Sequence, residues 1–379
     1  MPAPYDVIVI GLGAMGSSAV FHLASRGQRV LGLERYAIPH AQGSSHGFSR
    51  VIRLAYFEHP DYVPLLQRSY ENWFDLEKQS NQKILYQTGG LYMGEPDAEA
   101  ISGSLRAMKQ FNIPHQELTR AETMRRYPVF RIPEDYVGLW EEATGFLIPE
   151  RAVSCHCELA MRKGAELHGH EAVTSWQATS TGVRVTTNRG SYEAQRAIFC
   201  GGAWASDLVG DLGVDIYATR QTLVWVWPKK PELFTLEKFP VFMLETGPGQ
   251  GQHYGFPMMP DNPGFKIALH KVMQRTDPDR VQRDPQPGDE ETVRPVLRDM
   301  IPDADGPVLA IRTCLYENSP DSHFIIDNHP KHPNVTVACG FSGHGFKFAS
   351  VVGEAVADLS MQGSSKLPIG FLSLSRFSR

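Results

Sequence analysis

Cysteine is scarce in this sequence. Its 379 residues include five cysteines, an odd number spread thinly from Cys155 to Cys339. They do not form the dense disulfide framework of a small secreted protein. The N-terminus, Met1-Pro2-Ala3-Pro4, also lacks a basic segment and a cleavage site. We therefore expect a protein that stays in the reducing cytoplasm.

Long hydrophobic runs and an excess of basic residues are missing as well. The longest apolar stretches, such as residues 7–10 and 222–227, are far shorter than the ~20 residues that span a bilayer. Lys and Arg number 37 against 42 Asp and Glu, a net charge of −5, so no basic field attracts nucleic acid. With 42% hydrophobic residues, the chain has the composition of a globular protein with no membrane segment and no nucleic-acid partner.

The N-terminal segment has the pattern of a strand, a glycine turn, a helix and a second strand. Residues 7–10 form a β-branched run of the type found in buried parallel strands. A helix is expected over residues 17–25 and a strand over residues 29–33. This order predicts a βαβ unit.

The glycines between the first strand and the helix indicate a dinucleotide site. In Gly11-Leu12-Gly13-Ala14-Met15-Gly16, Gly11 makes the tight turn, Gly13 lets the backbone approach a diphosphate, and Gly16 lets the helix pack closely on the sheet. The helix N-terminus then favours the anion. Glu34 is placed to accept hydrogen bonds from an adenosine ribose, where its charge would repel a 2′-phosphate. The sequence therefore predicts NAD or FAD rather than NADP.

A glycine- and serine-rich loop follows Glu34 instead of another Rossmann strand. It reads Gly43-Ser44-Ser45-His46-Gly47-Phe48-Ser49-Arg50-Val51-Ile52-Arg53. Its backbone donors suit a second contact with a diphosphate or an isoalloxazine ring. Arg50 and Arg53 suit a flavin or a substrate carboxylate, because the planar guanidinium binds such groups in a bidentate manner. The alternative is two solvated surface arginines.

The rest of the chain returns to the nucleotide-binding layer and adds a strand-rich region at residues 219–316. The other expected elements are strands at residues 90–93, 183–187, 196–199 and 335–339, and helices at residues 98–111, 149–163 and up to residue 359. Trp225 and Trp227 alternate along a strand, which puts both on one face, and we expect both in the core. Lys266 and His270 share a face in either a helix or a strand. Without further information, this spacing is typical of a surface lysine and a core histidine.

Several segments together resemble monomeric sarcosine oxidase and its relatives, N-methyltryptophan oxidase and pipecolate oxidase, over nearly the whole chain. They are residues 11–16, 44–53, 254–257, 266–270, 313–316, 323–327 and 340–347. Their order and spacing make the match specific. The resemblance implies a flavin-dependent oxidase that converts secondary amino acids to imines and reduces oxygen to hydrogen peroxide.

The resemblance also implies the fold. It is an α/β fold, α+β overall, in which a Rossmann-like FAD-binding domain is interleaved with a substrate domain built on a mixed β-sheet. We expect residues 1–82, 148–218 and 317–379 to form the FAD-binding domain, and residues 83–147 and 219–316 to form the substrate domain.

The expected cofactor is FAD, held covalently. Cys314 alone reads as an inert buried thiol, but the resemblance implies a thioether from Cys314 to the 8α carbon of the flavin. Such a link prevents flavin loss and tends to raise the reduction potential. Cys155-His156-Cys157 lacks a second matching pair, so no metal is expected. The expected cofactor-binding residues are Gly11, Gly13, Gly16, Glu34, Arg35, Ser44, Ser45, Cys314, Gly343, Gly345 and Lys347.

The resemblance assigns a substrate site as well. Lys266 is expected over the flavin, where a fixed cation stabilises the anion formed as oxygen is reduced. Arg53 and Lys347 are expected around the substrate carboxylate. A lysine at a helix N-terminus opposes the macrodipole, which favours a functional reason for Lys347. The expected catalytic residues are Lys266, His270, Tyr254 and Arg50, and the expected substrate-binding residues are Arg53, Lys347 and Tyr316.

Three hypotheses about function remain open at this point. The preferred one is a monomeric oxidase whose partners are a small amino acid and O2. The others are an FAD-dependent dehydrogenase that uses a different electron acceptor, and a non-catalytic flavin-binding sensor. The glycine-rich residues before Tyr254 leave sarcosine, a larger N-methyl amino acid and a cyclic amino acid all as possible substrates.

Overall fold

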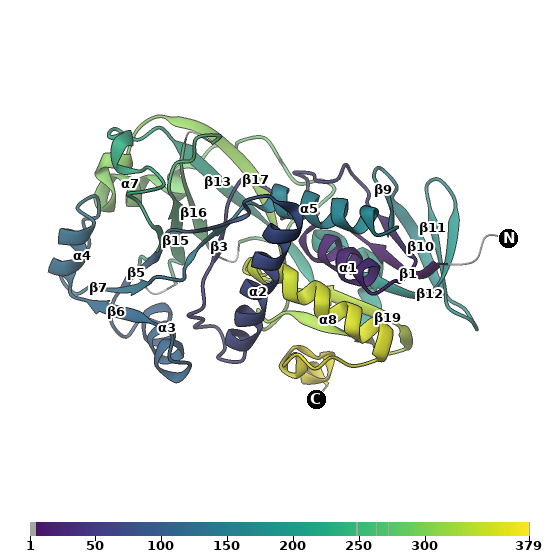
Figure 1. Ribbon diagram of the computed structural model, residues 1–379. Helices are drawn as coiled ribbons and strands as arrows, with labels where there is room; N and C mark the ends of the chain where they lie inside the picture. Colours follow the sequence, from purple (N-terminus) through teal and green to yellow (C-terminus); the bar gives the residue numbers. More distant parts are fainter. Residues whose placement is uncertain (1–4, 248, 263, 272, 379) are drawn as a thin grey trace.

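The computed structural model describes residues 5–247, 249–262, 264–271 and 273–378. Residues 1–4, and Pro248 among the glycine-rich residues before Tyr254, lie outside this part. The described chain forms two lobes, each built around an eight-stranded sheet (Figure 1). Two long strands, β13 (Tyr217–Val226) and β17 (Val308–Asn318), extend between the lobes. The architecture is the predicted α/β combination of a Rossmann-like layer and a mixed sheet.

The first sheet has a parallel centre. Strand β1 pairs in parallel with β2 and β12, β2 with β9, and β12 with β19. The hairpin β10–β11 and strand β18 are antiparallel additions. The strands are β1 (Tyr5–Ile10), β2 (Val30–Leu33), β9 (Glu166–His168), β10 (Val173–Ala178), β11 (Val183–Thr187), β12 (Ser191–Phe199), β18 (Ile325–His329) and β19 (His332–Cys339).

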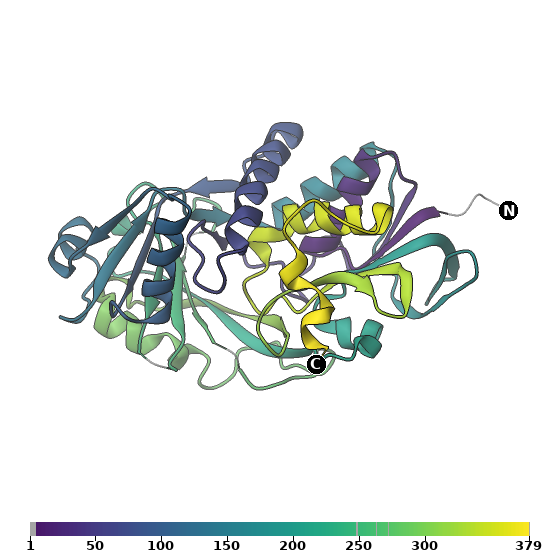
Figure 2. The same cartoon turned by 90° about the horizontal axis from the view of Figure 1, so that it is seen from below.

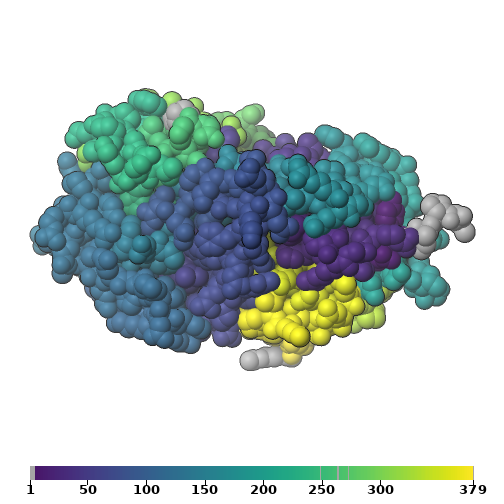
Figure 3. Space-filling model, viewed as in Figure 1, coloured from purple at the N-terminus to yellow at the C-terminus, as the bar shows by residue number. Residues whose placement is uncertain are grey.

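Helices from distant parts of the sequence pack together beside this sheet. Helix α1 (Ala14–Ser25) contacts both α5 (Pro149–Arg162) and α8 (Ala349–Gln362), and α8 also contacts α2 (Tyr62–Ser80). On the molecular surface the purple N-terminal segment and the yellow C-terminal segment are neighbours (Figure 3). Seen from below, the C-terminal segment lies across this same lobe (Figure 2). Among the described residues, no helix is long and apolar enough to cross a bilayer.

The glycine turn between β1 and α1 depends on close backbone contact. Gly11 has φ of +86°, and a Cβ there would lie 2.4 Å from the carbonyl oxygen of Cys200. A Cβ on Gly16 would lie 1.8 Å from the carbonyl oxygen of Gly11. Helix α1 begins at Ala14, three residues before the predicted start, and the Ser45 hydroxyl accepts a hydrogen bond from its first backbone N–H at 3.1 Å.

The second sheet is mixed. Its only parallel pair among the described strands is β5 with β14, and its core is rich in phenylalanine, including Phe130, Phe239 and Phe242. In sheet order its strands are β17, β13, β16 (Phe265–His270), β15 (Gln252–Phe256), β14 (Val241–Glu245), β5 (Gly90–Gly94), β7 (Val137–Glu141) and β6 (His115–Leu118).

A small three-stranded sheet completes the framework. Strand β8 (Gly145–Leu147) pairs with both β3 (Arg50–Ile52) and β4 (Leu85–Gln87). Strand β3 carries the first of the two arginines singled out in the sequence. The remaining helices are α3 (Glu99–Gln110), α4 (Arg120–Arg126), α6 (Ala205–Val209) and α7 (Arg294–Met300).

Most of the predicted elements are confirmed within a few residues. The strand at residues 183–187 has the predicted bounds, and the helix predicted over residues 149–163 ends at Arg162. The prediction that both tryptophans lie in the core is confirmed for Trp225 and wrong for Trp227. Trp225 is 3% exposed, but Trp227 is 42% exposed. The reason is that β13 ends at Val226, so the alternation no longer places Trp227 in the sheet.

Candidate active site

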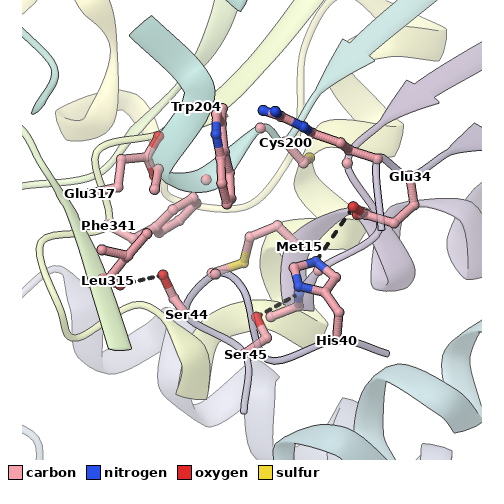
Figure 4. Close-up of a pocket in the computed structure, with 18 of the residues that line it drawn as sticks. Met15, Glu34, His40, Ser44, Ser45, Cys200, Trp204, Leu315, Glu317 and Phe341 are labelled. Atoms are coloured by element: carbon pink, nitrogen blue, oxygen red, sulfur yellow. Dashed lines mark hydrogen bonds and ion pairs between the residues drawn. The ribbon is translucent and has the colours of Figure 1, made fainter. Parts of the chain in front are cut away.

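Two adjoining cavities lie where the lobes meet. The first is lined by the glycine turn, Glu34 and the serine-rich loop (Figure 4). The second is lined by residues of the other lobe, including Tyr254 and His270. Both cavities reach a common wall, so a molecule in one cavity can touch a molecule in the other. The shared lining residues are Arg50, Cys314, Tyr316, Gly343 and Phe346.

Glu34 is held in place by backbone donors in the first cavity. Its carboxylate accepts hydrogen bonds from the N–H groups of Leu12 at 2.8 Å and Tyr36 at 3.0 Å. Burial opposes ionisation, but His40 and these N–H groups lower the pKa of Glu34. The side chain is therefore a carboxylate at neutral pH, which is the form that accepts hydrogen bonds from a ribose.

Asp279 joins two residues of the first cavity. It forms an ion pair with Arg35 at 2.8 Å and accepts a hydrogen bond from Trp204 Nε1 at 2.7 Å. Arg35 and Trp204 both line the cavity. Arg35, predicted to bind the cofactor, is thus tied to a loop of the strand-rich region.

Cys314 lies in the wall that the two cavities share. The sulfur is 3.4 Å from Arg50 Nη2, which also donates to the carbonyl oxygen of Ser44 at 2.7 Å. The Ser44 hydroxyl in turn donates to the carbonyl oxygen of Leu315. Burial would lower the pKa of Arg50, but neighbouring Cys314, Tyr254 and other groups raise it. Arg50 is a permanent cation beside the sulfur.

Lys266 lies on β16 and is 1% exposed. Its ammonium group donates to the carbonyl oxygens of Gly47 and Ser49, both at 2.8 Å, and to the Ser49 hydroxyl at 3.1 Å. It lies 4.8 Å from the ring centroid of Phe256. Burial and the nearby Arg50 lower the pKa of Lys266 well below its usual range. The three acceptors match the three N–H bonds of an ammonium group.

The two cations predicted to bind a carboxylate, Arg53 and Lys347, both line the second cavity, together with the acidic Glu58. Arg53 donates to both carboxylate oxygens of Glu58, at 2.8 and 3.0 Å. Lys347 donates to the carbonyl oxygen of His344 at 2.8 Å. Burial and the Arg53 charge lower the pKa of Lys347 to about 7, although Glu58 opposes the shift. Arg50 and Arg53 outweigh Glu58, so the cavity is positive even when Lys347 is neutral.

His270, Tyr316 and Tyr254 supply polar groups that carry no charge at neutral pH. His270 Nδ1 lies 3.1 Å from the Tyr316 hydroxyl. Burial lowers the pKa of His270 to about 4. Burial also raises the pKa of Tyr254, and that of Tyr316 well above its usual range. The imidazole and both phenols are therefore neutral.

Two carboxylates, the partly buried Glu150 and the buried Glu141, position the loop that carries these cations. Glu150 accepts from the N–H of Gly47 at 2.6 Å, at the start of α5. Glu141, at the end of β7, accepts from the N–H of Leu54 at 2.7 Å and from Ala55 at 3.1 Å. The backbone on either side of β3 is thus anchored, which holds Arg50 and Arg53 in one orientation.

The structure brings all the predicted site residues except Gly16 and Lys266 into the cavity walls. The sequence analysis missed Glu58, His344 and Glu317, which also line them. Glu58 lies five residues after Arg53, so a search for the counterion of Arg53 along the same loop would have found Glu58. His344 lies inside the glycine-rich segment 340–347 already singled out. Glu317 follows Tyr316 directly, and no local pattern marks it.

One group of side chains away from these cavities has the residue types of a metal site, namely Asp211, His329 and His332. The Lys331 N–H donates to His329 Nδ1 at 3.2 Å, and His329 Nε2 lies 2.8 Å from Asp211. Because Nδ1 accepts, Nε2 carries the proton and donates to Asp211. Both ring nitrogens of His329 are engaged, and we propose no metal there.

The first cavity fits a bound FAD. The glycine turn offers a backbone that a diphosphate can approach closely, and Glu34 offers acceptors to a ribose. A buried oxygen of Glu317 in the wall has no hydrogen-bond partner, which is typical of a site that a polar ligand completes. The residues that would hold FAD are Gly11, Gly13, Glu34, Arg35, Ser44, Ser45, Cys314, Gly343 and Gly345.

Comparisons with known proteins agree with this fit. The family described as FAD dependent oxidoreductase matches residues 6–359. Monomeric sarcosine oxidase of Streptomyces avermitilis is 44% identical over 98% of this chain and 97% of its own. N-methyl-L-tryptophan oxidase of Salmonella heidelberg is 34% identical over 99% of this chain and 100% of its own. The solved structure of NikD, an unusual amino acid oxidase essential for nikkomycin biosynthesis, has a TM-score of 0.86 at 25% identity, covering 98% of this chain and 97% of the other. The chain belongs to the FAD dependent oxidoreductase family, in the group that contains monomeric sarcosine oxidase and N-methyl-L-tryptophan oxidase.

Proposed function

We propose that the protein is an FAD-dependent oxidase of secondary amino acids, either N-methyl or cyclic, that forms an imine and hydrogen peroxide. The observation that carries the proposal is the positive second cavity, which shares a wall with the cavity that fits FAD. Sarcosine and N-methyl-L-tryptophan, which the names of the relatives contain, both combine a carboxylate with a secondary amine. The cavity offers cations to the first group and neutral polar side chains to the second.

In this proposal Arg53 and Lys347 bind the substrate carboxylate and hold the C–N bond in line for reaction. The amine must lose its proton first, because a protonated nitrogen has no lone pair to support the imine. The nearby cations disfavour a second positive charge, so they favour the neutral amine. His270 and Tyr316 are already neutral and are placed to accept or donate hydrogen bonds to it.

Bound FAD supplies the acceptor for the hydride that leaves the substrate, and O2 takes up the electrons. We assign to Lys266 the role of the cation where oxygen is reduced, because its three hydrogen-bond acceptors favour the ammonium form against the effect of burial and Arg50, which lower its pKa. Arg50 lies beside Cys314, and we propose Cys314 as the attachment point of the flavin. Gly343 lies against the Tyr316 ring, which keeps that part of the shared wall compact.

The proposal also covers the organisation of the chain. An FAD-binding domain of residues 1–82, 148–218 and 317–379 is supported by the strands of the first sheet, β1, β2, β9–β12, β18 and β19. A substrate domain of residues 83–147 and 219–316 is supported by most strands of the second sheet. Scarce cysteine supports a cytoplasmic location. We propose that the protein works as a monomer, because one chain supplies both cavities.

Oxygen uptake and peroxide yield test the proposed function. The purified protein is given sarcosine, N-methyltryptophan, proline and pipecolate, and O2 consumption and hydrogen peroxide are measured per substrate oxidised. We expect one O2 consumed and one hydrogen peroxide formed for each substrate molecule oxidised. Reduction of a dye without O2 uptake would instead identify a dehydrogenase. Failure of all four compounds to bleach the flavin without oxygen would overturn the proposed substrate class.

Replacing Cys314 by Ser is expected to abolish covalent flavin. The wild-type band on a denaturing gel should fluoresce, whereas the variant should release its FAD into the supernatant after acid precipitation. Cys200→Ser is the matched control, because Cys200 also lines the first cavity and burial raises the pKa of its thiol. A fluorescent band in Cys314→Ser would place the link elsewhere.

The affinity for a simple carboxylate is expected to fall as the pH rises above about 7. A bound carboxylate stabilises the protonated form of Lys347, whose pKa in the free enzyme is about 7. Above that pH the lysine must take up a proton on binding, so the dissociation constant increases by up to about tenfold per pH unit. Acetate titrations followed by the flavin spectrum measure this. Lys347→Met should remove the pH dependence, and an equal slope in that variant would contradict the assignment.

A further inference from the structure

Glu317 occupies an unusual place in the wall of the first cavity. It lies near the end of β17, three residues after Cys314, and is 4% exposed. It lines the cavity together with Trp204 and Phe341, and Figure 4 shows it on the same side as these two rings. Its Oε1 atom is buried and has no hydrogen-bond partner. The proposed oxidase reaction does not use this carboxyl group.

The surroundings of Glu317 favour an uncharged acid. The polar groups that face it are the backbone N–H groups of Gly340 and Phe341, and the thiols of Cys200 and Cys339 lie near it. No ion pair to Glu317 occurs within the described residues. Burial raises the pKa of Glu317 well above its usual range, although the two N–H groups oppose this. A neutral carboxyl group has one O–H donor.

The other two buried acids of this cavity, Glu34 and Glu171, differ from Glu317 because the protein already satisfies them. Glu34 accepts from the backbone of Leu12 and Tyr36. Glu171 accepts from the Thr187 hydroxyl at 2.7 Å and lies 2.9 Å from His168. Glu317 is therefore the buried acid in this wall with an oxygen left for a ligand, whereas the fourth acid of the wall, Asp207, is exposed.

The position of Glu317 indicates which part of the cofactor it faces. Cys200, which lines the same cavity as Glu317, lies against the glycine turn, where a Cβ on Gly11 would be 2.4 Å from the Cys200 carbonyl oxygen. On the other side, Cys314 lies in the shared wall. Glu317 thus lies between the expected diphosphate and flavin ends of the cavity. The part of FAD that joins these ends carries the ribityl hydroxyls and the diphosphate oxygens.

We propose that Glu317 acts as a neutral acid that donates a hydrogen bond to an oxygen of the ribityl–diphosphate part of FAD. These oxygens are good acceptors, and a phosphate oxygen would make the bond charge-assisted. An ionised Glu317 would repel the diphosphate instead. The inference rests on the FAD dependence of the family and is independent of the substrate proposed above.

FAD binding to the apoprotein tests this inference. The Cys314→Ser variant serves as the parent so that the cofactor is dissociable, and FAD titrations followed by fluorescence give dissociation constants. Glu317→Gln keeps a neutral donor and should bind FAD within about threefold of the parent, whereas Glu317→Met lacks the donor and should bind about tenfold or more weakly.

Glu245→Met is the matched control. Glu245 also has a buried oxygen without a partner, and burial raises its pKa, but it lies on β14 and lines neither cavity. Its substitution should leave FAD affinity unchanged. If Glu317→Met does not fold, as judged by thermal unfolding, Glu317→Ala replaces it. FAD binding as tight as the parent in these variants would overturn the inference, and equal weakening in Glu317→Gln would show that an ionised carboxylate is needed.

Discussion

Replacing Lys266 by Met is expected to slow the reaction of the reduced enzyme with O2 by roughly 10²- to 10³-fold. Anaerobic reduction of the flavin by substrate should change little, because the carboxylate-binding cations are untouched. Lys266 is buried and fixed by three acceptors of Gly47 and Ser49. Negative charge builds on oxygen as it is reduced, and a cation fixed in a site without water stabilises that charge. Stopped-flow measurement of each half-reaction tests the prediction.

The same substitution removes one of the two donors to each of the Gly47 and Ser49 carbonyl oxygens, so a control for stability is needed. Lys266→Gln is neutral but keeps an N–H donor for Gly47 or Ser49. It should slow reoxidation about as much as Lys266→Met while unfolding at a higher temperature. If Lys266→Met slows flavin reduction and leaves reoxidation intact, Lys266 belongs to the substrate site.

Replacing Lys347 by Met is expected to lower kcat/KM for amino acid substrates by ~2 to 5 kcal/mol of transition-state stabilisation. The neutral amide of the same substrate should lose much less, since it has no charge for the lysine to bind. Lys347 is 5% exposed, so little solvent screening weakens the contact. Steady-state kinetics with the acid and the amide measure the difference. Equal losses for both would show that Lys347 holds the flavin or the fold.

Arg53 needs a different design because it is already paired. Arg53→Met alone leaves the Glu58 carboxylate buried without its counterion, which is costly in itself. The double variant Arg53→Met with Glu58→Gln removes both charges together. Compared with the wild type, the double variant should lose activity on the acid substrate but much less on its amide. Glu58→Gln alone should not weaken binding of the acid.

Trp225 and Trp227 show what a local sequence pattern can predict and what it cannot. Alternation along residues 222–227 correctly places Trp225 in the core, at 3% exposure. It does not say where the strand ends, because that depends on the neighbouring strands that pair with it. Strand β13 stops at Val226, opposite Val308 of β17. Trp227 is consequently exposed.

The cations show a similar limit for the site. Arg50, Arg53, Lys266 and Lys347 were found from the sequence and from its resemblance to a family, yet the groups that they contact were not. The pairing of Arg53 with Glu58 and the contact of Lys266 with the loop at Gly47 were not predicted. Glu317 was not predicted for the same reason, because the lack of a hydrogen-bond partner for its buried oxygen is a property of the folded chain.

The sequence by itself determined the nucleotide-binding end of this protein, because the glycine turn, the strand before it and Glu34 are close together in the chain and obey local steric rules. Only the tertiary structure decided which groups the cations contact. Lys266 meets Ser49 across 217 positions of sequence, and Arg50 meets Cys314 across 264. Burial then sets their pKa values, since the cost of a charge depends on every group that surrounds it in the fold.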